Sequence, residues 1–253
     1  MIIKAIRTFI DDDHVPVINA STSSYMNMGF RCKQFCISSF LIDTGKEVIL
    51  VDTSFADTMK LLPEDMKFPV GIGHRIDTFK HALEKTGYTV NDVDKIVLTH
   101  FHLDHTAELQ LFPNARIFIC KRDYKSLKDK VPNIEQIDLT LNPFQNFAGS
   151  FKVADDVWML PAYGHSRGHS IVIAHQTGTT TANDFYYMFA GDLTASRTAL
   201  KNGEYLPLTV SKALSQESLD TVREFVKNNR TVYLLNHAKN IEQLIAEKMP
   251  LYE

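Results

Sequence analysis

The stretch "THFHLDHTAE", residues 99–108, places three histidines and one aspartate within the six positions 100–105. The whole chain has ten histidines, so this local density is unusual. The preceding segment "VDKIVL" (93–98) is short and rich in β-branched residues, and it predicts a strand. Side chains at i and i+2 of an extended segment point the same way, so we expect His100 and His102 to converge. Imidazole and carboxylate groups are ligands that divalent transition metals prefer, so the stretch predicts a metal site that also uses Asp104 and His105.

Three further residues of ligand type lie at or just past the ends of predicted strands. His169 follows "VWMLP", Asp192 ends "YYMFAGD" and His237 ends "TVYLLNH". Neighbouring strand ends share one edge of a sheet, so all seven groups could line one cleft. His165 lacks such a position, and we expect it to support a ligand by hydrogen bonding. The other histidines outside the cluster are expected to be surface or structural residues: His14, His74, His81 and His175.

These motifs resemble those of the metallo-β-lactamase fold superfamily. "THFHLDH" resembles its HxHxDH signature and "GHSRGH" (164–169) its second-histidine loop. "AGD" (190–192) resembles the segment of its bridging aspartate, and "NH" (236–237) that of its last histidine. Asp52 in "ILVDTS" resembles the aspartate that ends an early strand in this superfamily. The resemblance implies an α/β (α+β) fold, an αββα sandwich of two mixed β-sheets with helices on the outer faces, formed by one domain over residues 1–253.

The resemblance also implies how the residues divide between two metal ions. The first ion takes His100, His102 and His169, the second takes Asp104, His105 and His237, and Asp192 bridges them. Asp52 is expected to hold the histidine-rich loop by hydrogen bonds without binding metal. We expect two divalent ions about 3.5–4 Å apart. Zinc is the first expectation, with iron or manganese as alternatives.

Elsewhere the chain alternates predicted strands with predicted helices. "FCISSFLIDTGKEVILVDTS" (35–54) predicts two strands around a turn at 44–46. "IDTFKHALEKTG" (76–87) predicts a helix capped by Asp77, and "SQESLDTVREFVKNN" (215–229) an amphipathic helix capped by Ser215. Such alternation, with hairpins included, favours mixed sheets with helices packed outside.

The composition excludes several classes of partner. The chain has 253 residues, 44% of them hydrophobic, and a formal net charge of -3. This charge gives no support for binding to nucleic acid or to anionic lipid. No apolar stretch approaches the roughly 18 residues of a membrane span, and the start lacks the pattern of a secretory signal, so we expect a cytoplasmic protein. The three cysteines are expected to be free thiols.

The expected chemistry is hydrolysis by a hydroxide that bridges two metal ions and attacks a carbonyl carbon. Asp104 is expected to shuttle a proton to the leaving group as a catalytic residue as well as to bind metal. The ligand spacing and the 16 residues after His237 make the chain most similar to the N-acyl homoserine lactonase branch. Members of that branch carry a tyrosine three residues after the bridging aspartate, where this chain has Ala195. We therefore expect a lactonase-like enzyme for a small-molecule substrate.

Other readings stay open at this point. The same ligands would serve a thioester, ester or β-lactam hydrolase, an iron-dependent sulfur or redox enzyme, or a metal-binding protein without turnover. The segments 23–30 and 142–147 are apolar loops that could cover an acyl chain or simply pack under neighbouring residues. The sequence leaves open the acyl group, the metal loaded in the cell and the oligomeric state.

Overall fold

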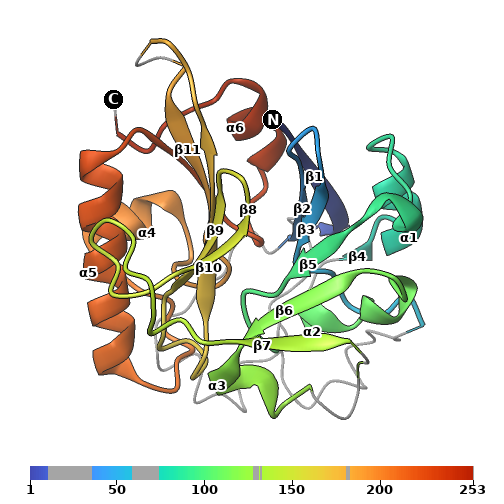
Figure 1. Cartoon of the computed structure of the whole chain (residues 1–253), viewed down its shortest axis with the longest axis horizontal. Coiled ribbons are helices and arrows are strands. Elements are labelled where there is room, and N and C mark those ends of the chain that lie inside the picture. Colours follow the sequence, from blue (N-terminus) through green and yellow to red (C-terminus); the bar gives the residue numbers. More distant parts are fainter. Residues whose placement is uncertain (11–35, 59–73, 128–130, 132, 181–182, 253) are drawn as a thin grey trace.

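A computed structural model describes residues 1–10, 36–58, 74–127, 131, 133–180 and 183–252 of the chain (Figure 1). Cys32 and the apolar segment 23–30 lie outside these residues. Two sheets face each other. Within the described residues, the larger has seven strands in the order β4-β1-β2-β3-β5-β6-β7. Their bounds are β1 Ile2–Ile10, β2 Ile37–Asp43, β3 Val48–Val51, β4 His74–Arg75, β5 Lys95–Val97, β6 Arg116–Cys120 and β7 Ile134–Ile137.

The second sheet has five strands in the order β12-β11-β10-β9-β8 among the described residues. Their bounds are β8 Phe151–Ala154, β9 Val157–Pro161, β10 Ser170–Gln176, β11 Phe185–Phe189 and β12 Thr231–Leu234. Both sheets are mixed. In the larger sheet β3, β5, β6 and β7 run parallel, while the pairs β1 with β2 and β2 with β3 are antiparallel. In the second sheet only the pair β11 and β12 is parallel. The expected pair of mixed sheets is confirmed.

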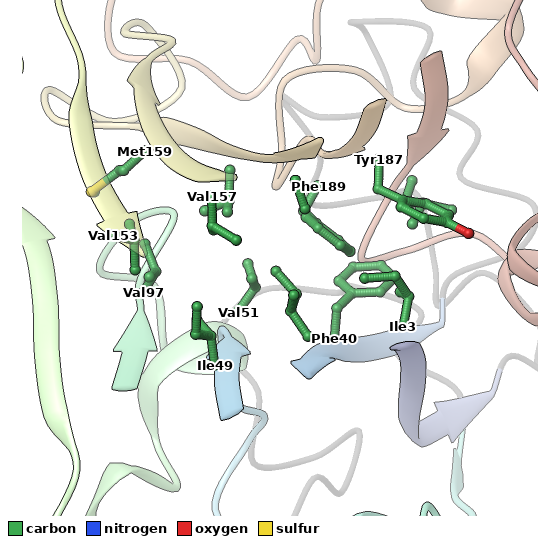
Figure 2. Close-up of a cluster of buried hydrophobic side chains, with 14 of the residues drawn as sticks. Ile3, Phe40, Ile49, Val51, Val97, Val153, Val157, Met159, Tyr187 and Phe189 are labelled. Carbon is green, nitrogen blue, oxygen red and sulfur yellow. The ribbon is translucent and has the colours of Figure 1, made fainter. Parts of the chain in front are cut away.

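Alternation along each strand explains the layers. In β2, Phe40 and Ile42 belong to the apolar core between the sheets, whereas Leu41 points to the opposite face. Figure 2 shows the inner core, in which side chains of the two sheets point toward one another. The rings of Phe40 and Phe189 meet there with centroids 4.9 Å apart. Burying both faces of each sheet requires a further layer on each outside.

Helices supply these outer layers. The described helices are α1 Phe79–Glu84, α2 Leu103–Thr106, α3 Lys121–Tyr124, α4 Arg197–Asn202, α5 Lys212–Asn228 and α6 Ile241–Ala246. Helix α5 lies along the outside of the smaller sheet (Figure 1) and buries Leu219 and Phe225 in the cluster that holds Ile173 of β10. Helix α1 buries Phe79 and Leu83 against the outer face of the larger sheet. The expected αββα sandwich is confirmed.

Two predicted helix caps were wrong, the first by one residue and the second by four. The first helix is capped by Thr78, whose hydroxyl accepts the His81 N–H, rather than by Asp77. The long helix α5 is capped by Ser211, whose hydroxyl accepts the Leu214 N–H, so the cap lies four residues before Ser215. Ser215 is instead a buried residue inside the helix. Within the described part of the chain, no helix combines the length and apolar character that crossing a bilayer requires.

Candidate metal centre

The candidate site lies where several strands of the two sheets end. His100, Asp192 and His237 each lie three residues after the last residue of β5, β11 and β12, respectively. The backbone N–H of Ser170, at the start of β10, donates to the Thr99 carbonyl at 2.8 Å, which joins the two sheets at this edge. The prediction that strand ends bring these residues together is therefore supported by the fold.

A first group of donor atoms consists of His100, His102, His165 and Asp192, all lying within 4.8 Å of one another. His102 Nδ1 lies 2.9 Å from His100 Nε2 and 3.1 Å from His165 Nε2. Asp192 Oδ2 lies 3.3 Å from His165 Nε2 and 3.9 Å from His100 Nε2. Three imidazole nitrogens and one carboxylate oxygen therefore point to a common centre.

A second group consists of Asp104, His105 and His237, again within 4.8 Å. Asp104 Oδ2 lies 3.5 Å from the Nε2 atoms of both histidines. The other oxygen of Asp192, Oδ1, lies 3.4 Å from His105 Nε2 and 3.0 Å from His237 Nε2. Asp192 thus directs one carboxylate oxygen to each group.

Two buried atoms support a cation at the second group. In the described part of the protein, neither His105 Nε2 nor Asp192 Oδ1 has a hydrogen-bond partner. Buried polar atoms are nearly always bonded, and an exception requires an explanation. Both atoms point toward the centre of the same group, where a divalent ion would satisfy the nitrogen lone pair and the carboxylate oxygen together. The residues present therefore fit a metal ion.

In three of these histidines a hydrogen bond at Nδ1 fixes the orientation of the ring. His165 Nδ1 donates to the Leu208 carbonyl at 2.6 Å, and His237 Nδ1 donates to the Cys36 carbonyl at 2.7 Å. His105 Nδ1 donates to Asp52 Oδ2 at 2.9 Å. In each ring Nε2 is left with its lone pair directed into the group. Histidines that ligate metals are commonly anchored in this way.

The side chain of Asp52 is hydrogen-bonded to the histidine-rich loop 99–105. Its buried carboxylate accepts the Thr99 N–H at 2.7 Å and the Thr99 hydroxyl at 2.8 Å, in addition to the bond from His105. It also accepts the Asn236 side-chain amide at 3.0 Å, which ties in the segment before His237. The expectation that Asp52 holds the histidine-rich loop by hydrogen bonds is confirmed. Its φ of 61° places it in the left-handed region that aspartate and asparagine tolerate.

The histidine pKa values differ between the two groups, because burial dominates in the first and nearby carboxylates outweigh it in the second. Burial lowers the pKa of His100 well below the usual histidine value and that of His102 to about 4, so both imidazoles are neutral. Burial also opposes the charging of His105, but the carboxylates of Asp104 and Asp192 outweigh it and raise its pKa. Burial would raise the pKa of Asp192, yet His237 and His105 hold it well below the usual range. The first group therefore offers neutral imidazoles, and the carboxylates around His105 in the second group favour a positive charge there, such as a metal ion would supply.

The two histidines of "GHSRGH" occupy different places. His165 lies in the first close group, in the position where we expected His169. His169 is fully buried, and its Nδ1 donates to the Ala162 carbonyl at 2.9 Å. Its Nε2 accepts the backbone N–H of Asp192 at 3.0 Å. We expected His169 at a strand end because it follows "VWMLP", but it lies eight residues past the end of β9 and directly before β10, whereas the loop carries His165 into the group.

Sequence reasoning missed Asp123, the third residue of α3. This buried carboxylate accepts the Ser166 hydroxyl and the Gly168 N–H at 2.8 Å, and so holds the loop that carries both histidines. A Cβ at Gly168 would lie 2.8 Å from the Asp123 nitrogen, which explains the glycine. The motif "GHSRGH" gave a signal for the loop, but nothing in the sequence connects it to α3.

Position 195 and the loop 142–147 are the described places where the sequence suggested contacts with a substrate. Position 195 carries an exposed alanine rather than a tyrosine. The hydroxyl of Tyr233 contacts Thr194 Oγ1 at 2.9 Å, but the residue is fully buried on β12. The loop 142–147 packs on the outer side of the smaller sheet, where Phe147 lies against Phe225 of α5 with ring centroids 5.6 Å apart. Of the two readings of this loop, simple packing is the one that its contacts support.

Comparison with known proteins gives the family. A model of the metallo-beta-lactamase superfamily matches residues 35–228, and the chain belongs to this superfamily. An N-acyl homoserine lactonase of Bacillus thuringiensis is 22% identical over 249 residues, which cover 91% of this chain and 89% of the lactonase. A probable metallo-hydrolase of Mycobacterium tuberculosis is 26% identical over 182 residues. That match covers 61% of this chain and only 56% of the mycobacterial protein.

Solved structures agree in fold. An N-acyl homoserine lactone hydrolase with N-hexanoyl-L-homoserine bound at its metal centre superposes with a TM-score of 0.69 at 20% identity, covering 99% of this chain and 96% of that one. A dizinc quorum-quenching lactonase gives a TM-score of 0.57 at 18% identity, covering 93% and 86%. At these identities the likeness establishes the fold. This fold agrees with the superfamily to which the chain belongs.

Proposed function

We propose that the protein is a hydrolase with two metal ions that cleaves a small carbonyl substrate, most closely an N-acyl homoserine lactone. The observation that carries the proposal is the carboxylate of Asp192, which directs Oδ2 to the first donor group and Oδ1 to the second. A carboxylate shared by two groups of ligand atoms is suited to hold two cations close together. The proposal draws further support from the family and from lactonases among the relatives.

The proposed ligands follow the close groups. The first ion would be held by His100, His102 and His165, the second by Asp104, His105 and His237, with Asp192 shared. This set differs from the sequence expectation in one residue, because His165 takes the place of His169. Imidazole nitrogen with carboxylate oxygen suits zinc, and also manganese or iron. We propose zinc first.

The chain's own residues would contribute to the reaction in distinct ways. Bound divalent ions would lower the pKa of a water molecule toward about 7 and polarise the carbonyl group of the substrate. The side chains of Asp104 and His237 are 17% and 15% exposed, whereas those of His100 and His105 are buried, so substrate would approach past the first two. A carboxylate oxygen of Asp104 would accept the proton given up by the attacking water and pass it to the departing alkoxide.

Ala195 favours a second candidate substrate class. In the lactonase branch a tyrosine at this position contacts the lactone carbonyl, and here the described tyrosine near Asp192, Tyr233, is buried and bonded to Thr194. Loss of an oxyanion donor can cost about 10²–10³ in rate. We therefore propose that acyl lactones are cleaved slowly, and that another ester or thioester is the alternative substrate.

Metal analysis combined with a substrate panel tests the proposal. Zinc-loaded protein should contain two ions per chain and hydrolyse at least one of an acyl lactone, an aryl ester, a thioester and a β-lactam. His100→Gln should lower both metal content and turnover. His175→Gln is the matched control, because His175 pairs with Asp184 at 2.6 Å and lies on β10 away from both groups. Two ions without turnover on any substrate would point to a metal-binding protein, and iron alone at one site to redox chemistry.

A further inference from the structure

We propose that His169 is a positioning residue that fixes the shared carboxylate of Asp192 through the Asp192 backbone N–H. The inference rests on the proposed two-metal function. Because the Ala162 carbonyl can only accept, His169 Nδ1 carries the proton and donates it at 2.9 Å. The lone pair of Nε2 then receives the Asp192 N–H at 3.0 Å. A lone pair that accepts this bond is not available to a cation, so the roles of ligand and of acceptor exclude each other.

The backbone before Asp192 is shaped around this ring. Gly191 has a φ of 52°, and a Cβ built on it would lie 2.7 Å from His169 Nε2 and 2.9 Å from Thr99 Oγ1. Only a residue without a side chain allows both neighbours to approach so closely. Thr99 is in turn bonded to Asp52. The turn that carries Asp192 is therefore held between the buried ring of His169 and the loop that carries the other donors.

The position of one carboxylate matters to both groups at once. Asp192 Oδ1 lies 3.0 Å from His237 Nε2, and Oδ2 lies 3.3 Å from His165 Nε2. If the N–H bond to His169 is lost, the turn can shift and both oxygens move together. Loss of a ligand histidine has a different consequence, because it empties one group and leaves the other. The two roles therefore predict different metal-binding patterns.

Two substitutions at His169 and one at His165 separate these roles. His169→Leu removes the acceptor in a buried environment, and His169→Gln keeps an amide oxygen that can accept the Asp192 N–H. His165→Ala removes a proposed ligand. Zinc content is measured by atomic emission at saturating zinc, the two affinities by competition with a chelator, and the coupling between ions by electron paramagnetic resonance of manganese-loaded protein. Circular dichroism and thermal unfolding of the metal-free proteins report folding.

We expect His169→Leu to bind two ions at saturation, with both affinities lowered about 10 to 100-fold, the usual effect of losing a residue that supports a ligand. The exchange coupling between its manganese ions should fall. His169→Gln should resemble the parent, and His165→Ala should keep one ion per chain.

Other results overturn the inference. Selective loss of one ion in either His169 variant would make His169 a ligand, and unchanged affinities and coupling in His169→Leu would show that it positions nothing. If His169→Leu does not fold, His169→Gln decides between a ligand and an acceptor. A parent protein that binds fewer than two ions refutes the proposed function instead, so the two failures are distinguishable.

Discussion

Asp52→Asn tests how the site is held, because it changes one buried atom and little else. The φ of 61° at this position is tolerated by asparagine as well as by aspartate, so the backbone gains no strain. The carboxylate accepts four hydrogen bonds, from the Thr99 N–H, the Thr99 hydroxyl, His105 Nδ1 and Asn236 Nδ2. An amide has one oxygen, so it cannot accept all four. If that oxygen keeps the Thr99 N–H, the new NH₂ group faces the remaining partners.

The consequences for two of these partners can be estimated. His105 Nδ1 can accept from the new NH₂ only if its proton moves to Nε2, the atom that faces the second group. Such a change should weaken the second metal about 10 to 100-fold. The Asn236 amide loses its acceptor inside the protein, and one unsatisfied buried donor costs about 1–3 kcal/mol. The first group should lose less affinity than the second, since Asp52 reaches its rings only through the Thr99 hydroxyl, which lies 3.0 Å from His100 Nδ1.

Chelator competition resolves the two zinc affinities, and urea unfolding of the metal-free protein gives the stability. Asp94→Asn is a suitable control. Asp94 also accepts a backbone N–H, from Val48 at 2.8 Å, but at the opposite end of β3 from Asp52. We expect this control to leave both metal affinities unchanged. A folded Asp52→Asn protein whose second zinc binds as tightly as in the parent would refute the reasoning.

Three further substitutions test separate parts of the site. Asp104→Ala should leave about one ion per chain by atomic emission and abolish turnover, and two retained ions would mean that the ligands are divided wrongly. Asp123→Asn should weaken the first ion about 10-fold in chelator competition and spare the second, because the amide cannot accept from both Ser166 and Gly168. Equal weakening of both ions would assign Asp123 a general structural role. Ala195→Tyr should raise kcat/KM for acyl lactones at unchanged metal content, and a fall in metal content would mean that the ring disturbs Asp192 instead.

Much of the fold could be predicted because its signals are local. The hairpin of β2 and β3 and the amphipathic face of α5 both follow from periodicity and turn residues. The strand β1 was not predicted, because the start of the chain was considered only as a candidate secretory signal. Helix caps failed where two hydroxyl residues compete, as with Ser211 and Ser215. That residues 1–253 form a single domain stays a prediction.

The place of Ser215 inside α5, rather than at its cap, depends on a contact between distant segments. A Cβ on Gly164 would lie 2.2 Å from the Ser215 hydroxyl oxygen, so α5 packs directly on the loop that begins at Gly164. This contact joins residues 51 positions apart, and it fixes where the helix must start. The Thr209 hydroxyl also donates to the Gly164 carbonyl. A local capping preference of about 1 kcal/mol is easily overridden by such packing.

The choice between His165 and His169 depends on geometry of the same kind. Both are fully or nearly buried histidines of one six-residue loop, and both anchor Nδ1 on a carbonyl, at Leu208 and Ala162 respectively. Composition and spacing therefore cannot distinguish them. The two histidines differ in what their Nε2 atoms face. His165 Nε2 faces the other ligand atoms of the first group, whereas His169 Nε2 accepts the Asp192 N–H. Asp123 and α5 determine that difference by holding the loop from two sides. The sequence thus predicts that these ligand-type residues cluster, whereas the role of each residue depends on contacts between distant segments.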